Sequence, residues 1–156
     1  MNKENIIFIA GTGTGVGKTF ITASIYRELE LNNKAVITQK WVQSGSKNYD
    51  DIKSHLNVQN KTLKDVDPYL KAMCPYQFDF PGSPHLAAAQ ENDEVSVEKC
   101  LTATQSLSNI VDFVLVEGSG GLMVPLNPHQ TYCDVLEKTK YPTVLVVDNT
   151  LGSINH

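Results

Sequence analysis

Residues 11–19 read GTGTGVGKT, and this stretch decides the fold. The apolar run of residues 6–10 precedes it and predicts a buried strand. Aliphatic residues at every fourth position between 21 and 29 follow it and predict a helix. The glycines let successive amides point inward, and the N-terminus of the helix adds partial positive charge toward an anion. The sequence therefore predicts a phosphate-binding loop near its start.

Lys18 and Thr19 end this loop and have defined tasks in such proteins. Lys18 is expected to reach the terminal phosphates of a nucleotide, and the Thr19 hydroxyl is an oxygen ligand of the kind that Mg²⁺ prefers. The strict pattern has a glycine six positions before the lysine, where this chain has Thr12, with Gly11 one position earlier. The loop is thus a variant. An incidental Lys-Thr pair in a glycine-rich turn is the less favoured alternative, because strand, glycines and helix all coincide with the pair.

A dinucleotide-binding turn is a second alternative, since the glycines at 11, 13 and 15 resemble its fingerprint. That fold gives Lys18 and Thr19 no task. It also needs an acidic residue at the end of the second strand, where this chain has Thr38-Gln39-Lys40. We therefore prefer the P-loop interpretation.

Four apolar runs predict the strands of one sheet, at residues 6–10, 35–38, 113–116 and 143–147. Helical patterns lie between them, and such alternation is typical of a parallel sheet with right-handed crossovers. Residues 65–84, rich in proline and aromatic side chains, are expected to form an ordered excursion packed on the domain. We predict an α/β fold of three layers, a parallel sheet flanked by helices, of the P-loop nucleoside triphosphate hydrolase type, in a single ATP-binding domain over residues 1–156.

Composition limits the possible partners and locations. The chain has 156 residues, 41% of them hydrophobic, and a formal charge of -4, which suits one globular core and offers no basic surface for nucleic acid. The first apolar run is too short for a signal peptide or a membrane span, so we expect no membrane partner and a cytoplasmic location. The three cysteines form no CxxC pair, so we expect free buried thiols and neither a disulfide nor a zinc site.

Polar residues after the predicted strands are the next candidates, because ligands bind beyond the carboxyl ends of parallel strands. Lys40 follows the second strand and precedes a turn containing Ser44. Asp50 and Asp51 begin a predicted short helix, where an acid can simply cap the helix or interact favourably with its dipole. Glu117 ends a buried run and fits the acidic residue that holds Mg²⁺ or its waters in P-loop enzymes. The histidines lack partners at metal-ligand spacing, and we give them no chemical role.

Several motifs together resemble the dethiobiotin synthetase family. They are the loop at 11–19, Lys40-x-Val42-x-Ser44-Gly45, Pro75-Tyr76-x-Phe78, Ser83-Pro84-His85, Glu117-Gly118-Ser119-Gly120-Gly121 and Leu151-Gly152-x-Ile154-Asn155-His156. The resemblance implies a cyclo-ligase of biotin biosynthesis that forms carbon–nitrogen bonds. Such an enzyme converts 7,8-diaminononanoate (7,8-diaminopelargonate), CO₂ and ATP to dethiobiotin, ADP and phosphate. It further implies Mg²⁺ and a homodimer with its sites at the interface.

The resemblance also assigns tasks to residues. Lys40 and Lys18 would be catalytic and would neutralise the carbamate and the transferring phosphoryl group. The metal ligands would be Thr19, Asp51 and Glu117, with Asp51 chosen over Asp50 because Asp51-Ile52 better resembles the family's helix start. The substrate would contact Thr14, Lys40, Ser44 and, from the partner subunit, Asn155. The nucleotide and its metal would be bound by Gly15, Val16, Gly17, Lys18, Thr19, Phe20, Asp51, Glu117, Gly118, Ser119 and Gly120.

The chain departs from the family pattern at two positions, with Gly13 where Asp is usual and Trp41 where Pro is usual. The family also continues beyond the point matching His156 with elements that recognise adenine, so we expect this chain to lack its C-terminal portion. Two other functions stay open. Partitioning or iron-protein ATPase switches carry an extra lysine five residues before the P-loop lysine, and Gly13 at that position argues against them. A non-catalytic nucleotide-binding relative is the other.

Overall fold

The computed structural model describes residues 5–151 and residue 153. Within them, β1 (Ile6–Gly11), β2 (Val36–Lys40), β5 (Phe113–Glu117) and β8 (Thr143–Val146) form a sheet in the order β2-β5-β1-β8. Every pairing in this sheet is parallel. The carboxyl ends of the strands therefore share one edge, and the register places Lys40 opposite Glu117. The predicted parallel sheet is confirmed.

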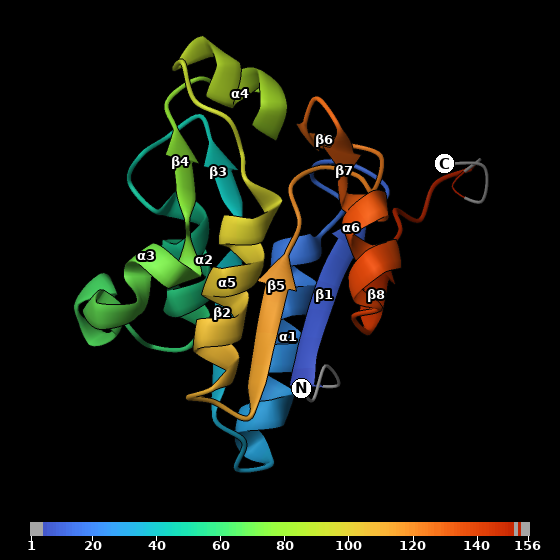
Figure 1. The fold of residues 1–156 in the computed structure, drawn as a ribbon. Helices are drawn as coiled ribbons and strands as arrows, with labels where there is room; N and C mark the ends of the chain where they lie inside the picture. Colours follow the sequence, from blue (N-terminus) through green and yellow to red (C-terminus); the bar gives the residue numbers. More distant parts are fainter. Residues whose placement is uncertain (1–4, 152, 154–156) are drawn as a thin grey trace.

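Helices cover both faces of this sheet (Figure 1). Helix α1 (Lys18–Leu31) lies behind it, while α5 (Val97–Ser108) and α6 (Tyr132–Thr139) lie in front. This gives the three predicted layers. Helix α2 (Asp50–Val58) packs against α1 and β2, and so stands close to the carboxyl end of β2.

The segment after β2 is more regular than the sequence predicted. Residues 43–46 were expected to form a turn, but β3 (Val42–Ser44) pairs in parallel with β4 (Tyr76–Phe78). Between these strands lie α2, the 3₁₀ helix η2 (Leu63–Tyr69) and α3 (Leu70–Met73), so the expected excursion is ordered. The turn begins only at Gly45, whose φ of 84° lies in the left-handed region that favours glycine.

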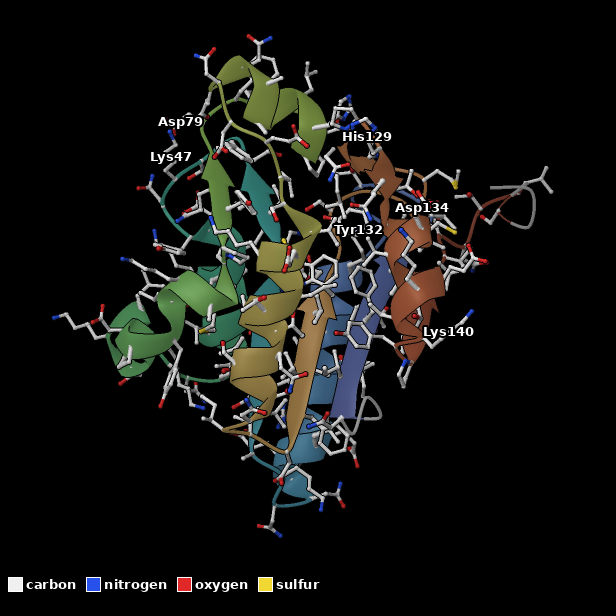
Figure 2. All side chains as sticks on the ribbon, in the orientation of Figure 1. Lys47, Asp79, His129, Tyr132, Asp134 and Lys140 are labelled. Atoms are coloured by element: carbon white, nitrogen blue, oxygen red, sulfur yellow. The ribbon has the colours of Figure 1, made fainter. Side chains whose placement is uncertain are left out.

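The remaining elements flank the same edge of the sheet. Helix α4 (Pro84–Gln90) contacts β3 and the hairpin of β6 (Pro125–Asn127) and β7 (Gln130–Thr131). Figure 2 shows Lys47, in the loop after β3, beside Asp79. Lys47 Nζ lies 3.3 Å from Asp79 Oδ2 and also pairs with Glu91 at the end of α4. These ion pairs tie the loop after β3 to the segment after β4 and to the end of α4.

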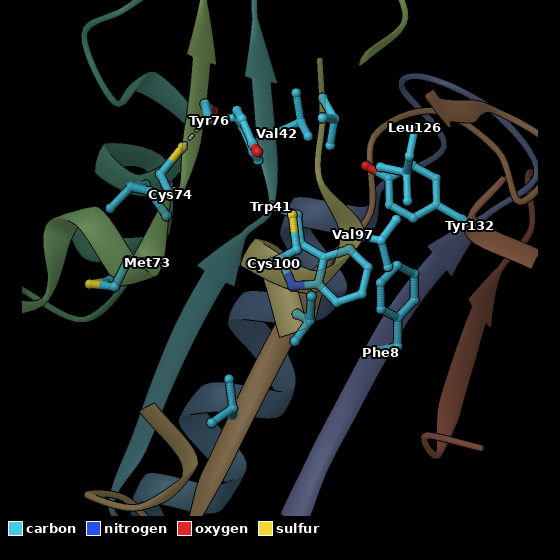
Figure 3. Close-up of a cluster of buried hydrophobic side chains, with 14 of the residues drawn as sticks. Phe8, Trp41, Val42, Met73, Cys74, Tyr76, Val97, Cys100, Leu126 and Tyr132 are labelled. Atoms are coloured by element: carbon cyan, nitrogen blue, oxygen red, sulfur yellow. Dashed lines mark hydrogen bonds between the residues drawn. The ribbon is translucent and has the colours of Figure 1, made fainter. Parts of the chain in front are cut away.

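An aromatic cluster fills the space between the sheet and its front helices (Figure 3). The rings of Phe8 and Trp41 meet edge to face with centroids 5.5 Å apart, and Trp41 and Tyr132 stack at 6.2 Å. Trp41 is fully buried, and its Nε1 donates to Gln39 Oε1 at 3.1 Å and Thr104 Oγ1 at 2.9 Å. The residue after Lys40 is thus anchored in the core and to α5.

The cysteines form no disulfide among the described residues. Cys74 and Cys100 are buried, and burial raises the pKa of each thiol to about 12. Cys133 is exposed on α6, so the expectation that all three thiols are buried was wrong for this one. Among the helices of the described ranges, none has the length and apolarity needed to cross a membrane.

Candidate active site

The loop between β1 and α1 adopts a shape that requires glycine at particular positions. Gly15 (φ 78°) and Gly17 (φ 101°) have left-handed backbones, and Gly17 is the N-cap of α1. A Cβ on Gly11 would lie 2.9 Å from Val16 Cγ2 and 3.0 Å from Lys18 Cδ, so the loop packs closely against Gly11. Gly13 is different, because a Cβ there would meet only Val16 Cγ1 at 3.9 Å.

Lys18 connects this loop to the turn after β5. Its Nζ donates to Gly13 O at 2.6 Å and to Gly120 O at 2.9 Å. Burial lowers the pKa of Lys18 from its ordinary value, and the neighbouring charge of Lys40 lowers it further. An ammonium has three donors, so one stays available for a ligand oxygen.

Glu117, at the end of β5, is the centre of the polar network. Oε1 accepts from Thr19 Oγ1 at 3.2 Å and from Lys40 Nζ at 3.0 Å. Oε2 accepts from Thr22 Oγ1 at 3.2 Å and from His55 Nε2 at 2.8 Å. Burial alone would raise its pKa, but the hydrogen bond from His55 and the charge of Lys40 lower it to about 2. Glu117 is therefore ionised near neutral pH.

Lys40 has a second carboxylate partner. Its Nζ lies 3.0 Å from Asp51 Oδ2, and it reaches Gly118 O at 3.4 Å. Burial lowers the pKa of Lys40, but the charges of Glu117 and Asp51 outweigh burial and raise it above the ordinary value. Lys40 thus holds a buried positive charge at the carboxyl end of β2. Asp50, in contrast, points toward Lys53, with 3.4 Å between Oδ1 and Nζ.

These groups border a cavity of about 690 Å³. Of the residues predicted for the site, its lining includes Thr14, Gly15, Gly17, Lys18, Thr19, Phe20, Lys40, Ser44, Asp51, Glu117, Ser119 and Gly120. Val16 and Gly118 do not line it. Val16 instead supports the loop beside Gly11, and a Cβ on Gly118 would lie 3.0 Å from the Phe8 ring. The predicted contact of Asn155 lies outside the described residues.

Two serine hydroxyls at the cavity donate to backbone. Ser44 Oγ donates to Gly82 O at 2.7 Å, and Ser119 Oγ donates to Val42 O at 2.7 Å. Each serine joins two segments of the cavity wall. The oxygen of each hydroxyl keeps its acceptor capacity for a ligand donor such as an amine.

Sequence reasoning missed part of the site. It gave no role to His55, although His55 lies four residues after Asp51 and therefore on the same face of α2. It also passed over Thr22, three residues after Thr19 on α1. Cavity-lining residues that were not predicted are Val42, Gly82, Ser83, Pro84 and Val124. The spacing of three or four along a helix is the signal that could have identified His55 and Thr22.

The stability of the folded protein in acid is expected to depend on Glu117. Its folded pKa of about 2 lies below the ordinary 4.5, so its stabilisation is complete above pH 4.5 and is lost as the pH falls toward 2. The loss in the free energy of unfolding is on the order of 3 kcal/mol. Denaturant titrations in buffers without divalent ions, from about pH 6 downward, measure this loss. A Glu117→Gln variant should lose less over this range, and an equal loss in both proteins would contradict the assignment.

Comparisons with known proteins identify the family of this chain. A family model described as an AAA domain matches residues 5–156. The chain is 42% identical over 152 residues to ATP-dependent dethiobiotin synthetase BioD 2 of Haemophilus influenzae, covering 97% of this chain and 79% of the relative. It is 41% identical to the enzyme of the same name in Pasteurella multocida, over 97% of this chain and 71% of that one. ATP-dependent dethiobiotin synthetase BioD of Chlorobaculum tepidum is 39% identical to this chain, and the match covers 99% of this chain and 64% of that enzyme. With 39–42% identity to these enzymes over nearly its whole length, the chain belongs to the dethiobiotin synthetase family.

Proposed function

We propose that this chain closes the ureido ring of dethiobiotin from 7,8-diaminononanoate, CO₂ and ATP, releasing ADP and phosphate. The observation that carries the proposal is the meeting of Lys18, Lys40 and Glu117 at one cavity beside a phosphate-binding loop. Family membership favours this ligase over an ATPase switch.

The reaction has three bond-forming steps. One amine of the substrate attacks CO₂ and loses a proton to give a carbamate. A carbamate oxygen then attacks the γ-phosphorus of ATP, and ADP leaves. The second amine finally attacks the carbonyl of this mixed anhydride, loses a proton and expels phosphate, which closes the ring. Negative charge develops on oxygen at each step, so a fixed positive charge is what the site must supply.

Lys40 and Lys18 are suited to supply that charge at two different points. Lys40 is held by Glu117 and Asp51, so its ammonium is oriented before any substrate binds, and it would stabilise the carbamate. Lys18 follows the loop and would contact the transferring phosphoryl group with its remaining donor. Thr14 and Ser44, both at the cavity, would accept hydrogen bonds from the diamine.

The donor set at the cavity fits Mg²⁺. The Thr19 hydroxyl and the carboxylates of Asp51 and Glu117 are hard oxygen donors, and all three residues line the same cavity. Within the described residues, no group of three or more His, Cys, Asp and Glu could hold a metal. Mg²⁺ binds through one or two carboxylates together with water and substrate phosphates, so the carboxylates of Asp51 and Glu117 would be enough for it. When bound, the ion would neutralise charge on the phosphates; Thr19, Asp51 and Glu117 would hold it.

We also propose a homodimer in the cytoplasm. The aromatic ring of Phe20 lines the cavity yet is 74% exposed, which supports a partner subunit near the cavity mouth. Asn155 of the partner subunit would then bind the carboxylate tail of the substrate. The free thiols of Cys74, Cys100 and Cys133 suit a reducing compartment.

Labelled bicarbonate tests the proposed function directly. Purified protein given the diamine, bicarbonate, ATP and Mg²⁺ is expected to incorporate label into dethiobiotin, with one ADP formed per ring. ATP hydrolysis that does not depend on the diamine would instead indicate a switch. Nucleotide binding without any product would indicate a non-catalytic relative, and either result would overturn the proposal.

A further inference from the structure

His55 is a buried histidine whose position the proposed reaction does not explain. It lies on α2, is 1% exposed, and places Nε2 2.8 Å from Glu117 Oε2. Its neighbour on the same helix face, Asp51, contacts Lys40. Helix α2 therefore reaches the site at two points, once at the cavity wall and once behind Glu117.

The two oxygens of Glu117 face different surroundings. Oε1 meets Lys40 and Thr19, which both line the cavity, whereas Oε2 meets Thr22 and His55, which do not. The χ3 angle of a glutamate side chain has a broad distribution, so the rotamer alone does not fix the orientation of the carboxylate plane. Its hydrogen-bond partners must do so.

Of the two donors to Oε2, His55 is the stronger candidate for this task. The Thr22 hydroxyl has a single hydrogen, and Thr22 Oγ1 lies closer to Lys18 O, at 2.9 Å, than to Glu117, at 3.2 Å. Its bond to the carboxylate is thus shared. His55 Nε2 is closer to Glu117, and an ionised carboxylate can only accept, so Nε2 carries the hydrogen. Among the described residues Nδ1 has no partner, which leaves the interaction with Glu117 as the polar contact of this ring.

We propose that His55 is a positioning residue that fixes the Glu117 carboxylate with Oε1 facing the cavity, where the divalent cation and ATP would bind. The inference rests on the proposed function for its ligand, because Glu117 is the residue expected to hold Mg²⁺. His55 itself would not contact the cation, since Nε2 is engaged with Oε2.

The test compares two substitutions that differ in one donor. His55→Leu removes the hydrogen bond, whereas His55→Gln offers an amide N–H at nearly the same place. Binding of Mn²⁺ in the presence of ADP, followed by its paramagnetic resonance signal, is expected to weaken about 10–100-fold in His55→Leu. In His55→Gln it should stay within a few-fold of the original protein. Ile52→Ala is the matched control, because Ile52 is buried on the same helix and makes no polar contact with Glu117.

Three results would overturn the proposal: unchanged Mn²⁺ binding in His55→Leu, equal weakening in both His55 variants, or equal weakening in Ile52→Ala. The last would show that α2 packing, and not the donor, matters. A nitrogen-15 spectrum of the imidazole keeps the test decisive if His55→Leu does not fold. Nε2 should carry the hydrogen, and an Nε2 without one would refute the inference. Because the binding assay needs no ring closure, a failure of the proposed function would show separately, in the labelled-bicarbonate assay of the original protein.

Discussion

Replacing Lys40 with methionine is expected to lower the turnover of dethiobiotin formation by about 10³-fold. Methionine keeps much of the apolar stem but removes the charge that would stabilise the carbamate and its phosphorylated product. Nucleotide affinity should change only a few-fold, because the contacts of Lys18 with the loop and with Gly120 do not involve Lys40. Steady-state kinetics measures the turnover, and calorimetry with ADP measures the affinity.

Lys47→Met is the matched control for Lys40→Met. Lys47 also pairs with two acids, Asp79 and Glu91, but it lies outside the cavity lining. Its substitution should leave turnover unchanged. If Lys40→Met lost nucleotide binding as strongly as turnover, the carbamate assignment would be wrong, and Lys40 would have to be a nucleotide ligand.

Trp41→Ala is expected to lower the free energy of unfolding by about 3–5 kcal/mol. The substitution removes the ring that packs against both Phe8 and Tyr132 in the aromatic cluster of Figure 3. It also removes the indole donor that Gln39 and Thr104 share. Equilibrium unfolding in urea, followed by circular dichroism, measures the change, since the protein has no other tryptophan for fluorescence.

Trp41→Phe separates the ring from its N–H group. It should cost about 1–3 kcal/mol, because an aromatic ring stays in place while Gln39 Oε1 loses one of its two donors. Leu31→Ala, at the exposed end of α1, should change the unfolding free energy by less than about 0.5 kcal/mol. A loss in Trp41→Ala no larger than that of Leu31→Ala would show that Trp41 is not a core anchor.

The four strands of the sheet could be predicted because each is a continuous apolar run. The end of β2 could not be predicted in this way. The apolar pattern stops at Thr38, but the strand continues through Gln39 and Lys40. Both side chains are buried because distant groups satisfy them: Gln39 Nε2 donates to Ala72 O at 2.7 Å, and Lys40 pairs with Glu117. Periodicity measures hydrophobicity along the chain and carries no information about partners that are remote in sequence.

Partners that are remote in sequence also explain why only part of the candidate site could be predicted. Lys18, Lys40 and Glu117 could be brought together in advance, because parallel strands end at one edge and the loop follows β1. Asp51 was the preferred acid, and the structure places it at the cavity while Asp50 faces Lys53, although their roles remain predictions. His55 was missed, since its partner Glu117 is 62 residues away. The helical spacing from Asp51 could have placed His55 on the side of α2 that faces the site, but the spacing does not identify Glu117 as its partner.

A side chain at position 13 would affect the charge of the phosphate loop but not its backbone shape. Gly11, Gly15 and Gly17 set the path of the backbone through close contacts or left-handed angles, while position 13 has room for a side chain at ordinary contact distance from Val16. Position 13 can therefore hold either glycine or an acidic residue without a change in the backbone path of the loop. Since Lys18 Nζ lies 2.6 Å from the carbonyl of Gly13, that exchange would alter the electrostatic potential at the ammonium. Residue 13 is thus a position where a side chain could change the charge near Lys18 while the backbone of the phosphate loop keeps its path.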